Sequence, residues 1–328
     1  MIEQIERYYE AGVTDGLPVI PPTQERVEAM IEAMGLPKDH VVGVLQPSGI
    51  NIRVMEIAVN AVMAGCLPEY GPVVLAAIKG ILDERFAGWG IACSTKGCAP
   101  LLIVNGPIRK KIKINCQGAV FGSGTRANAT IGRAVRLVLQ NVCGAKPPHL
   151  DRSTIGHGGK YTYCIGEDEE GSPWEPLHVE KGLSPEKSAV TLIGGEAPRL
   201  ISIVTNSAEA ILYAAAETIS CIGLLGLDMD TSNDWSRPYL FVFAKEHRDI
   251  LQAQGWTKDK IKEFLMENAV IPVERLRRAG IKLDQDAKML GRKEDIYIVA
   301  AGGSAGAFSC VVPGWSWMSQ PITVPIAE

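Results

Sequence analysis

The chain has 328 residues, with 33 basic and 37 acidic side chains and a formal net charge of −4. Hydrophobic residues make up 46% and charged residues 21%, which is near the globular average and excludes a disordered or fibrous chain. The mild acidity argues against a sequence-independent nucleic-acid binder, because such a protein needs a basic face. No stretch of about 18 uninterrupted apolar residues occurs, and the acidic, amphipathic start is unlike a secretory signal. We therefore expect a cytoplasmic protein with neither a membrane nor a nucleic-acid partner.

The first half of the sequence predicts mainly helices. The segments expected to be helical are residues 1–10, 25–34, 54–66, 71–84 and 127–142. Thr23 is expected to cap the second of these helices. In the last of them, apolar residues keep a period of 3.6 residues until Gly144 ends the helix. A buried strand is expected at 101–104.

The second half alternates strands and helices. Residues 145–185 are rich in glycine, proline and charge, carry little periodicity, and are expected to form a long functional loop or domain junction. Residues 283–294 are polar and are expected to be exposed. Strands are expected at 189–194, 200–204, 239–243 and 296–300, and helices at 207–220, 246–254 and 257–268. Thr257 is expected to cap the last helix.

This order of elements predicts an α/β fold with sheets covered by helices. We expect a first lobe at residues 1–150, a functional loop or junction at 151–185, and a second lobe at 186–328. A strand, a glycine loop and a helix occur in both lobes, as a distant internal duplication would produce.

Two of the eight cysteines stand out. The chain has too few cysteines for a disulfide scaffold and no Cys-x-x-Cys pair, so most are expected to be small buried residues. Cys93 and Cys98, however, lie five residues apart in a polar segment before the strand at 101–104. Lys96 is close enough in sequence to lower the pKa of a thiol, which would give a nucleophile or redox thiol. The pair can also supply two ligands to zinc or to an iron–sulfur cluster, or be incidental to a loop.

A glycine-rich turn opens into the helix predicted at 127–142. Its free N–H groups and the positive end of the helix dipole suit a phosphate or carboxylate, and Arg126 can add a bidentate clamp. Asn128 can instead be structural. The segment is neither a Walker A loop nor a Rossmann loop. The residues expected to bind substrate here are Gly122, Ser123, Gly124, Thr125, Arg126 and Asn128.

A second glycine segment follows the strand at 296–300. Gly302, Gly303 and Ser304 can form a nest of backbone donors for an anion, or simply a tight turn. Beyond it, Trp315 and Trp317 are expected to close a pocket or to bury against a second subunit.

The junction concentrates titratable residues. His157 lies between two glycines, which is unusual for a core histidine, and it suits general acid or base catalysis together with Lys160. Further along, His178 can partner Glu175 or simply end a strand. The acidic run at 167–170 is expected to be a solvated turn.

Three long segments resemble a widespread, uncharacterised bacterial family. They are DGLPVIPPT at 15–23, RANATIGRA at 126–134 and SPWEPLHVE at 172–180. That family is associated with small proteins that carry a Gly-Ser-Cys motif preceded by selenocysteine or cysteine. The resemblance covers nearly the whole chain and implies reductive or nucleophilic bond cleavage by a thiol or selenol. Because this sequence has no Cys-Gly-Ser-Cys of its own, the motif would lie on a small partner protein.

The sequence thus predicts a cysteine-dependent enzyme, a thiol oxidoreductase or lyase, that cleaves a bond at carbon in a small anionic organic substrate. This interpretation requires no cofactor. One alternative is a hydro-lyase or hydrolase that uses zinc, nickel or an iron–sulfur cluster. Another is a non-catalytic subunit that docks a thiol or selenol protein. We expect a homo-oligomer, as for most soluble proteins of this kind.

Overall fold

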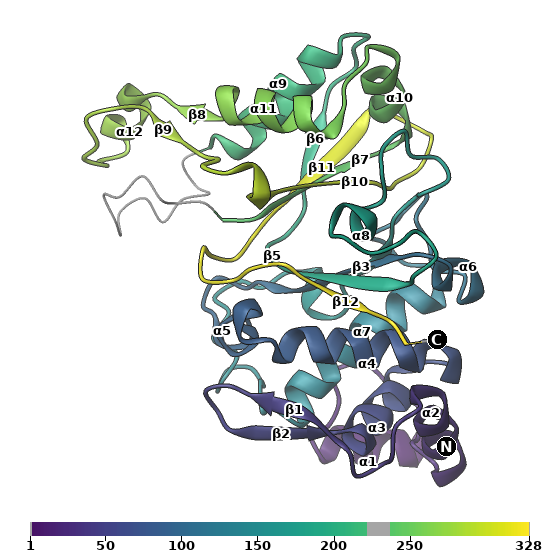
Figure 1. Cartoon of the computed structure of the whole chain (residues 1–328). Coiled ribbons are helices and arrows are strands. Elements are labelled where there is room, and N and C mark those ends of the chain that lie inside the picture. Colours follow the sequence, from purple (N-terminus) through teal and green to yellow (C-terminus); the bar gives the residue numbers. More distant parts are fainter. Residues whose placement is uncertain (1, 222–236, 328) are drawn as a thin grey trace.

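The computed structural model describes residues 2–221 and 237–327 and confirms a mixed α/β fold (Figure 1). Two four-stranded sheets lie face to face at its centre. The first has the order β12 (Ile322–Pro325), β5 (Ala189–Gly195), β3 (Ala99–Asn105), β4 (Cys164–Gly166). The second has the order β10 (Ile296–Ala300), β7 (Tyr239–Phe243), β11 (Phe308–Pro313), β6 (Arg199–Ser202). Only β3 with β4 and β7 with β10 pair in parallel among the strands of these two sheets.

Helices cover the outer face of each sheet. Below the first sheet in Figure 1 lie α4 (Gly71–Leu82) and α7 (Arg126–Asn141), and beneath these pack α1 (Ile2–Glu10), α2 (Gln24–Met34), α3 (Val54–Ala64) and a hairpin of β1 (Val41–Leu45) and β2 (Ile50–Arg53). Above the second sheet lie α9 (Ala208–Ile219), α10 (Lys245–Ala253) and α11 (Lys258–Asn268). The shorter elements are α5 (Gly88–Cys93), α6 (Ile108–Lys111), α8 (Leu177–Glu180), α12 (Val273–Arg278), β8 (Val270–Ile271) and β9 (Ala287–Lys288).

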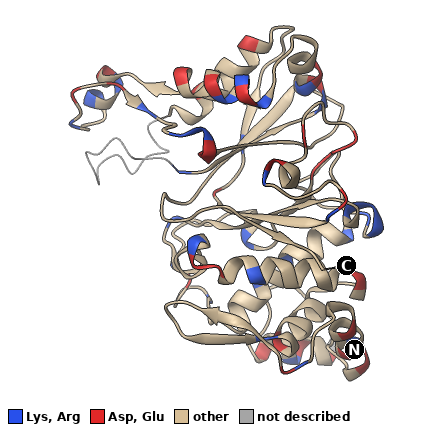
Figure 2. Ribbon diagram, in the orientation of Figure 1, with Lys and Arg blue, Asp and Glu red and all other residues tan. Residues whose placement is uncertain are grey.

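The alternation of side chains along each strand produces three separate cores. In β3, Leu101 and Ile103 point to the second sheet, while Leu102 and Val104 point to the helices α3, α4 and α7. In β7, Leu240 and Val242 face the first sheet. The aromatic residues between them along the strand face α9 and α11; they are Tyr239, Phe241 and Phe243. The strands themselves are almost free of charge, since Arg199 is the one charged residue among the strands of the two sheets (Figure 2).

Most predicted elements are confirmed, and the differences are local. Thr257 caps α11 by accepting a hydrogen bond from the Lys260 N–H (3.3 Å), whereas the Thr23 side chain makes no capping bond to α2. The expectation that 283–294 is exposed is wrong in part, because Met289 and Leu290 are buried.

Strands from both expected lobes share the first sheet. β4 lies inside the segment expected to be a loop, and β5 and β12 lie after residue 186, yet all three belong to the sheet of β3. The chain therefore returns to the first sheet after it has built the second. None of the described helices has the length and apolar character needed to cross a membrane.

Gly132 lies at a close contact between α7 and the backbone that leads into β4. A Cβ added to this α7 residue would lie 2.5 Å from the backbone nitrogen of Tyr163, just before β4. We expect Gly132→Ala to lower the free energy of unfolding by about 2 kcal/mol, despite the better helix propensity of alanine, because backbone cannot move aside. Urea denaturation measures this. Gly158→Ala is the control, since its added Cβ meets nothing within 4 Å, and an equal loss in both variants would contradict the prediction.

Candidate functional site

The segment from Cys93, the last residue of α5, to Cys98 is covered by the loop that carries His157. The Thr154 N–H donates to the Thr95 carbonyl (2.9 Å), and the Ser153 hydroxyl donates to the Ser94 carbonyl (3.4 Å). Gly97 has a φ of +77° and packs so closely on Gly156 that a Cβ would lie 2.9 Å from its nitrogen. The fold thus brings together the two segments that the sequence singled out separately.

A buried carboxylate, Asp151, anchors this loop. Its Oδ2 accepts from the Lys160 ammonium group (2.7 Å) and from the Arg136 guanidinium of α7 (3.0 Å). Its Oδ1 accepts from the Ser153 hydroxyl (2.6 Å). These donors outweigh the effect of burial and hold the pKa of Asp151 below its usual value. Sequence reasoning missed Asp151 as a site residue, because nothing in the sequence indicates that it meets Arg136.

Beside Asp151 lies a cavity of about 490 Å³, which we call the Asp151 pocket. Its charged lining consists of the cations Arg136, Lys146 and Lys160 and the carboxylates Asp15 and Asp151. Asp15 is already paired with Arg133 (2.7 Å), which lies outside the lining. The pocket therefore carries an excess of positive charge, which suits a small anion.

His157 lines the same pocket. Its Nδ1 accepts a hydrogen bond from the Gly159 N–H (3.0 Å), and its ring meets Tyr163 edge-on with 5.4 Å between the ring centroids. Burial, with a contribution from the Lys160 charge, lowers the pKa of His157 below its usual value. The imidazole is therefore neutral at pH 7 and able to accept a proton.

Both thiols lie near Lys160 but differ in burial. Cys98 is 1% exposed, its thiol donates to the Ile91 carbonyl (3.6 Å), and burial raises its pKa to about 11. Cys93 is half-buried at the end of α5, and burial together with the Asp151 charge raises its pKa, against the opposing effect of Lys160. Of the eight cysteines, five are buried, as expected for most of them.

Lys96 does not activate the cysteines as the sequence predicted. Its ammonium group pairs with Glu196 (2.9 Å) and donates to the Trp315 carbonyl (3.0 Å). Its charge does lower the pKa of Cys98, but burial has the larger effect and the pKa rises. Trp315 in turn donates from its indole nitrogen to the Ser94 hydroxyl (2.8 Å), whereas Trp317 is 66% exposed.

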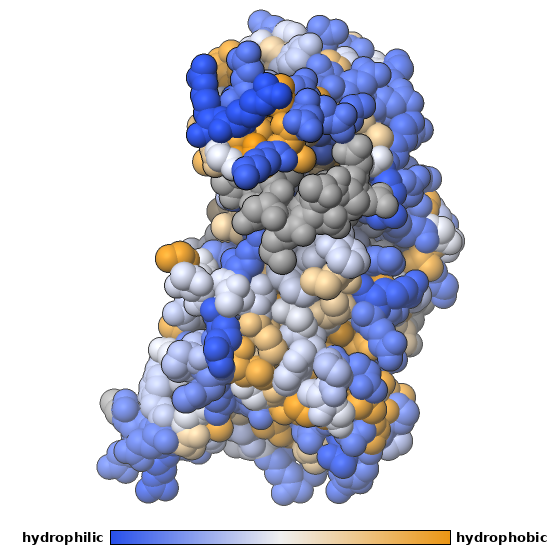
Figure 3. Space-filling view, turned by 90° about the vertical axis from the view of Figure 1, so that its left-hand side faces the viewer, coloured by the Kyte–Doolittle hydropathy of each residue, from blue (hydrophilic) through white to orange (hydrophobic). Residues whose placement is uncertain are grey.

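The face that lies to the left in Figure 1, the side of α5, is mostly hydrophilic. Figure 3 shows its apolar residues in separate small patches.

The first glycine segment follows Phe121, whose ring packs against Tyr163 with 5.7 Å between the centroids, and Tyr163 in turn packs against His157. None of its residues lines the Asp151 pocket. Arg126 donates to the Gly65 carbonyl at the end of α3 (2.9 Å). Asn128 is buried and fully engaged, with hydrogen bonds to the backbone of Asn115 (2.7 and 2.9 Å) and to the Cys164 carbonyl (3.1 Å). Asn128 thus has the structural role rather than a binding role. The exposed residues of the turn are Gly122, Ser123 and Gly124, and Thr125 makes no side-chain cap.

The second glycine segment, at 302–304, contacts residues 116–118, which come shortly before the first glycine segment in the sequence. The Gly302 N–H donates to the Cys116 carbonyl (2.9 Å), and a Cβ at Gly303 would lie 3.0 Å from the Cα of Gly118. The glycines at 302 and 303 are therefore explained by the close approach of two backbones. Ser304 is exposed.

His178 and Glu175 do not form the expected pair. His178 is completely buried, Glu175 is exposed, and within the described chain no hydrogen bond joins their side chains. Burial lowers the pKa of His178. The prediction of a solvated turn at 167–170 is also wrong in part, because Glu167 and Asp168 are buried.

Two arginines neutralise this acidic segment. Arg109 bonds Glu169 (2.8 Å) and Glu170 (2.9 Å), and Arg248 bonds Asp168 (2.8 Å). The Glu167 carboxylate accepts instead from the Asn105 amide (2.6 Å) and the Leu177 N–H (2.8 Å).

The described residues contain no ligand cluster for the metal-dependent alternative. In residues 2–221 and 237–327, no three histidine, cysteine or acidic side chains come together as a metal site requires. Cys93 and Cys98 have no further ligand of this kind beside them in the described structure.

Neither a protein-family model nor a curated protein sequence matches this chain. The resemblance to the family associated with Gly-Ser-Cys proteins therefore stays a prediction. Inference about the chemistry of this chain rests on the geometry of the Asp151 pocket.

Asp151→Asn tests the anchoring carboxylate. We expect it to lower the free energy of unfolding at pH 7 by about 3 kcal/mol, because Lys160 and Arg136 would face each other without a counter-charge. Since the folded-state pKa of Asp151 is lowered, its contribution is present above about pH 4 and is lost as the pH falls through that lower value. The difference from wild type should shrink accordingly in urea denaturation below pH 4.

The control is Asp83→Asn, whose partner Arg85 is 66% exposed. We expect a loss below about 1 kcal/mol from this pair. Equal losses from the two substitutions, or a difference at Asp151 that does not change with pH, would contradict the account.

Proposed function

We propose that this protein is a cysteine-dependent enzyme that cleaves a bond at carbon in a small anionic organic molecule. The observation that carries the proposal is the Asp151 pocket, in which the cations outnumber the carboxylates and which His157 lines. Neither Cys93 nor Cys98 lines the pocket, but Cys93 lies near its residues Asp151 and Lys160. Its volume of about 490 Å³ falls within the range of small-molecule sites.

Cys93 is the better candidate for the nucleophile. It is half-buried, whereas Cys98 is buried and its thiol is occupied by the Ile91 carbonyl. Cys93 is also close enough to Asp151 and Lys160 for both charges to act on its pKa. Because that pKa is raised, the thiol is protonated at neutral pH and needs a base as it attacks.

In this proposal the base is His157, which lines the pocket. Sγ of Cys93 attacks the electrophilic carbon and forms a C–S bond, while the leaving group departs with the electron pair of the broken bond. His157 takes the thiol proton on Nδ1, which gives up its hydrogen bond from the Gly159 N–H, and passes the proton to the leaving group, as a general base and then a general acid. Water next attacks the same carbon, the C–S bond breaks, and one proton from water returns to the sulfur. Lys160 and Arg136 hold the anionic group of the substrate during both steps.

Affinity labelling with iodoacetate tests this assignment, because thiol alkylation by iodoacetate repeats the first step and releases iodide. We expect Cys93 to react with iodoacetate at a rate that saturates with concentration and exceeds the rate with neutral iodoacetamide. Lys160→Gln should reduce the iodoacetate rate about tenfold and the iodoacetamide rate about twofold at most, since it removes one charge-assisted contact. His157→Gln should slow both reagents at pH 7. Peptide mass spectrometry identifies the labelled thiol.

Cys116 is the matched internal control, because it is also half-buried but lies near the other end of β3. It should prefer the neutral reagent and show no saturation. The proposal fails if Cys93 shows the same preference as Cys116, or if Cys98 is labelled first.

A further inference from the structure

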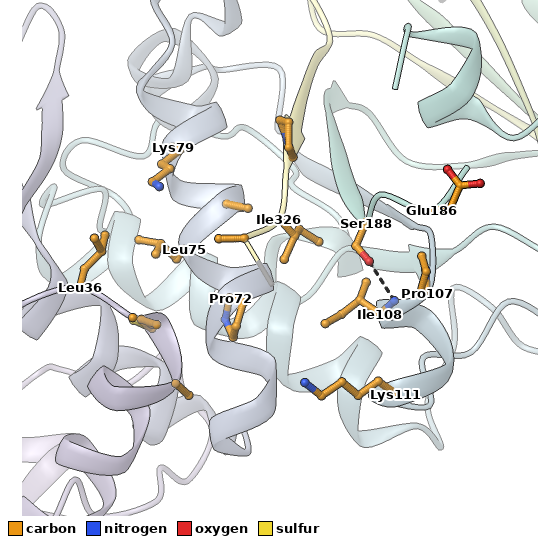
Figure 4. A pocket seen from close by; sticks show the side chains of 16 residues that line it. Leu36, Pro72, Leu75, Lys79, Pro107, Ile108, Lys111, Glu186, Ser188 and Ile326 are labelled. Carbon is orange, nitrogen blue, oxygen red and sulfur yellow. Dashed lines mark hydrogen bonds between the residues drawn. The ribbon is translucent and has the colours of Figure 1, made fainter. Parts of the chain in front are cut away.

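A second cavity, of about 750 Å³, opens in the helical layers below the first sheet (Figure 4). We call it the α4 groove. Its walls come from the end of α2, one face of α4, the turn into α6, the segment at 186–188 and the C-terminal segment at 325–327. It shares no lining residue with the Asp151 pocket.

The floor of the α4 groove is apolar. Pro72, Leu75 and Ala76 lie on one face of α4, at the spacing of neighbours along a helix. Leu36 and Ile326, from distant parts of the chain, close the floor around them (Figure 4). Such a surface binds an apolar body by removing it from water.

Two lysines flank this floor. Lys79 continues the same face of α4, and Lys111 lies at the end of α6; both are exposed (Figure 4). Neither ammonium group has an ion-pair partner in the part of the chain that the structure describes, although Lys110, next to Lys111, pairs with Glu170. Glu186 is the one carboxylate of the described lining, and it points away from the floor in Figure 4. Among the described residues, the groove therefore presents two lysines without an ion-pair partner beside an apolar surface.

Ser188 adds a polar group to this surface. Its hydroxyl oxygen accepts from the Ile108 N–H (3.0 Å), and its carbonyl accepts from the Ile326 N–H (2.8 Å). The hydroxyl hydrogen has no acceptor among the described residues and can donate to a ligand.

We propose that the α4 groove binds an amphipathic organic anion, with its apolar body on the floor and its carboxylate or sulfonate head at one of the two lysines, Lys79 or Lys111, that lie on opposite sides of the floor (Figure 4). An apolar cavity with a few polar groups at its rim is the usual form of such a site, and the two lysines favour an anionic head. This site is independent of the proposed reaction at Cys93, and a failure of one leaves the other standing.

Fluorescence titration with anilinonaphthalene sulfonate tests the site. This probe has an aromatic body and one sulfonate, and it brightens in apolar surroundings. We expect saturable binding to the full-length protein, and a Kd about tenfold higher in Lys79→Gln/Lys111→Gln, because a charge-assisted contact is worth roughly that factor. Phenylnaphthylamine, which lacks the sulfonate, should bind both proteins equally.

Lys110→Gln is the matched control, because it removes the same charge from α6 outside the groove and should leave the Kd unchanged. Ala76→Phe fills the floor and should abolish binding of both probes, with circular dichroism as the check on its fold. The proposal is overturned if wild type does not bind the sulfonate saturably, or if the double variant binds it like Lys110→Gln.

Discussion

The candidate site depends on one buried ionic cluster. Asp151 receives Lys160 and Ser153 from its own loop and Arg136 from α7, so a single carboxylate ties the loop to the helical layer. The same loop then hydrogen-bonds the segment that carries the cysteines. A carboxylate buried in this way is stable only while its partners remain, and its position therefore determines where His157 and the pocket lie.

Two groups of polar residues lie at opposite ends of β3. At its start lie the thiols, the Asp151 pocket and His157. At its end, Glu167 is held by Asn105, and Arg109 neutralises the acidic residues that come after it. Every carboxylate of that second group has a bonded partner from another element, but Asn105 Oδ1, Arg109 Nε and Glu167 Oε1 are buried without a hydrogen-bond partner in the described structure. The excess of cations is found only at the first group and in the α4 groove, among the described cavities.

Local patterns in the sequence predict local structure well. The period of α7 and the apolar runs of β7 and β10 place these elements within one residue of their observed bounds. The three-residue β4 has no such signal, because its identity as a strand comes from pairing with β3. The same holds for the site. The sequence identifies His157, Lys160 and the cysteines by residue type, but Asp151 gains its role only from Arg136 in space. The opposite happens at three residues that the sequence assigned to anion binding, because their contacts within the fold account for them. They are Asn128, Gly302 and Gly303.

The most direct test of the central claim is hydrogen–deuterium exchange of Asp151→Asn against wild type, under native conditions. If the buried carboxylate holds the loop on the cysteine segment, exchange should rise at 153–160 and at 93–98 and stay unchanged at 208–219 in α9, which packs in the separate core above the second sheet. Unchanged exchange at 153–160, or an equal rise at 208–219, would show that Asp151 does not organise this site.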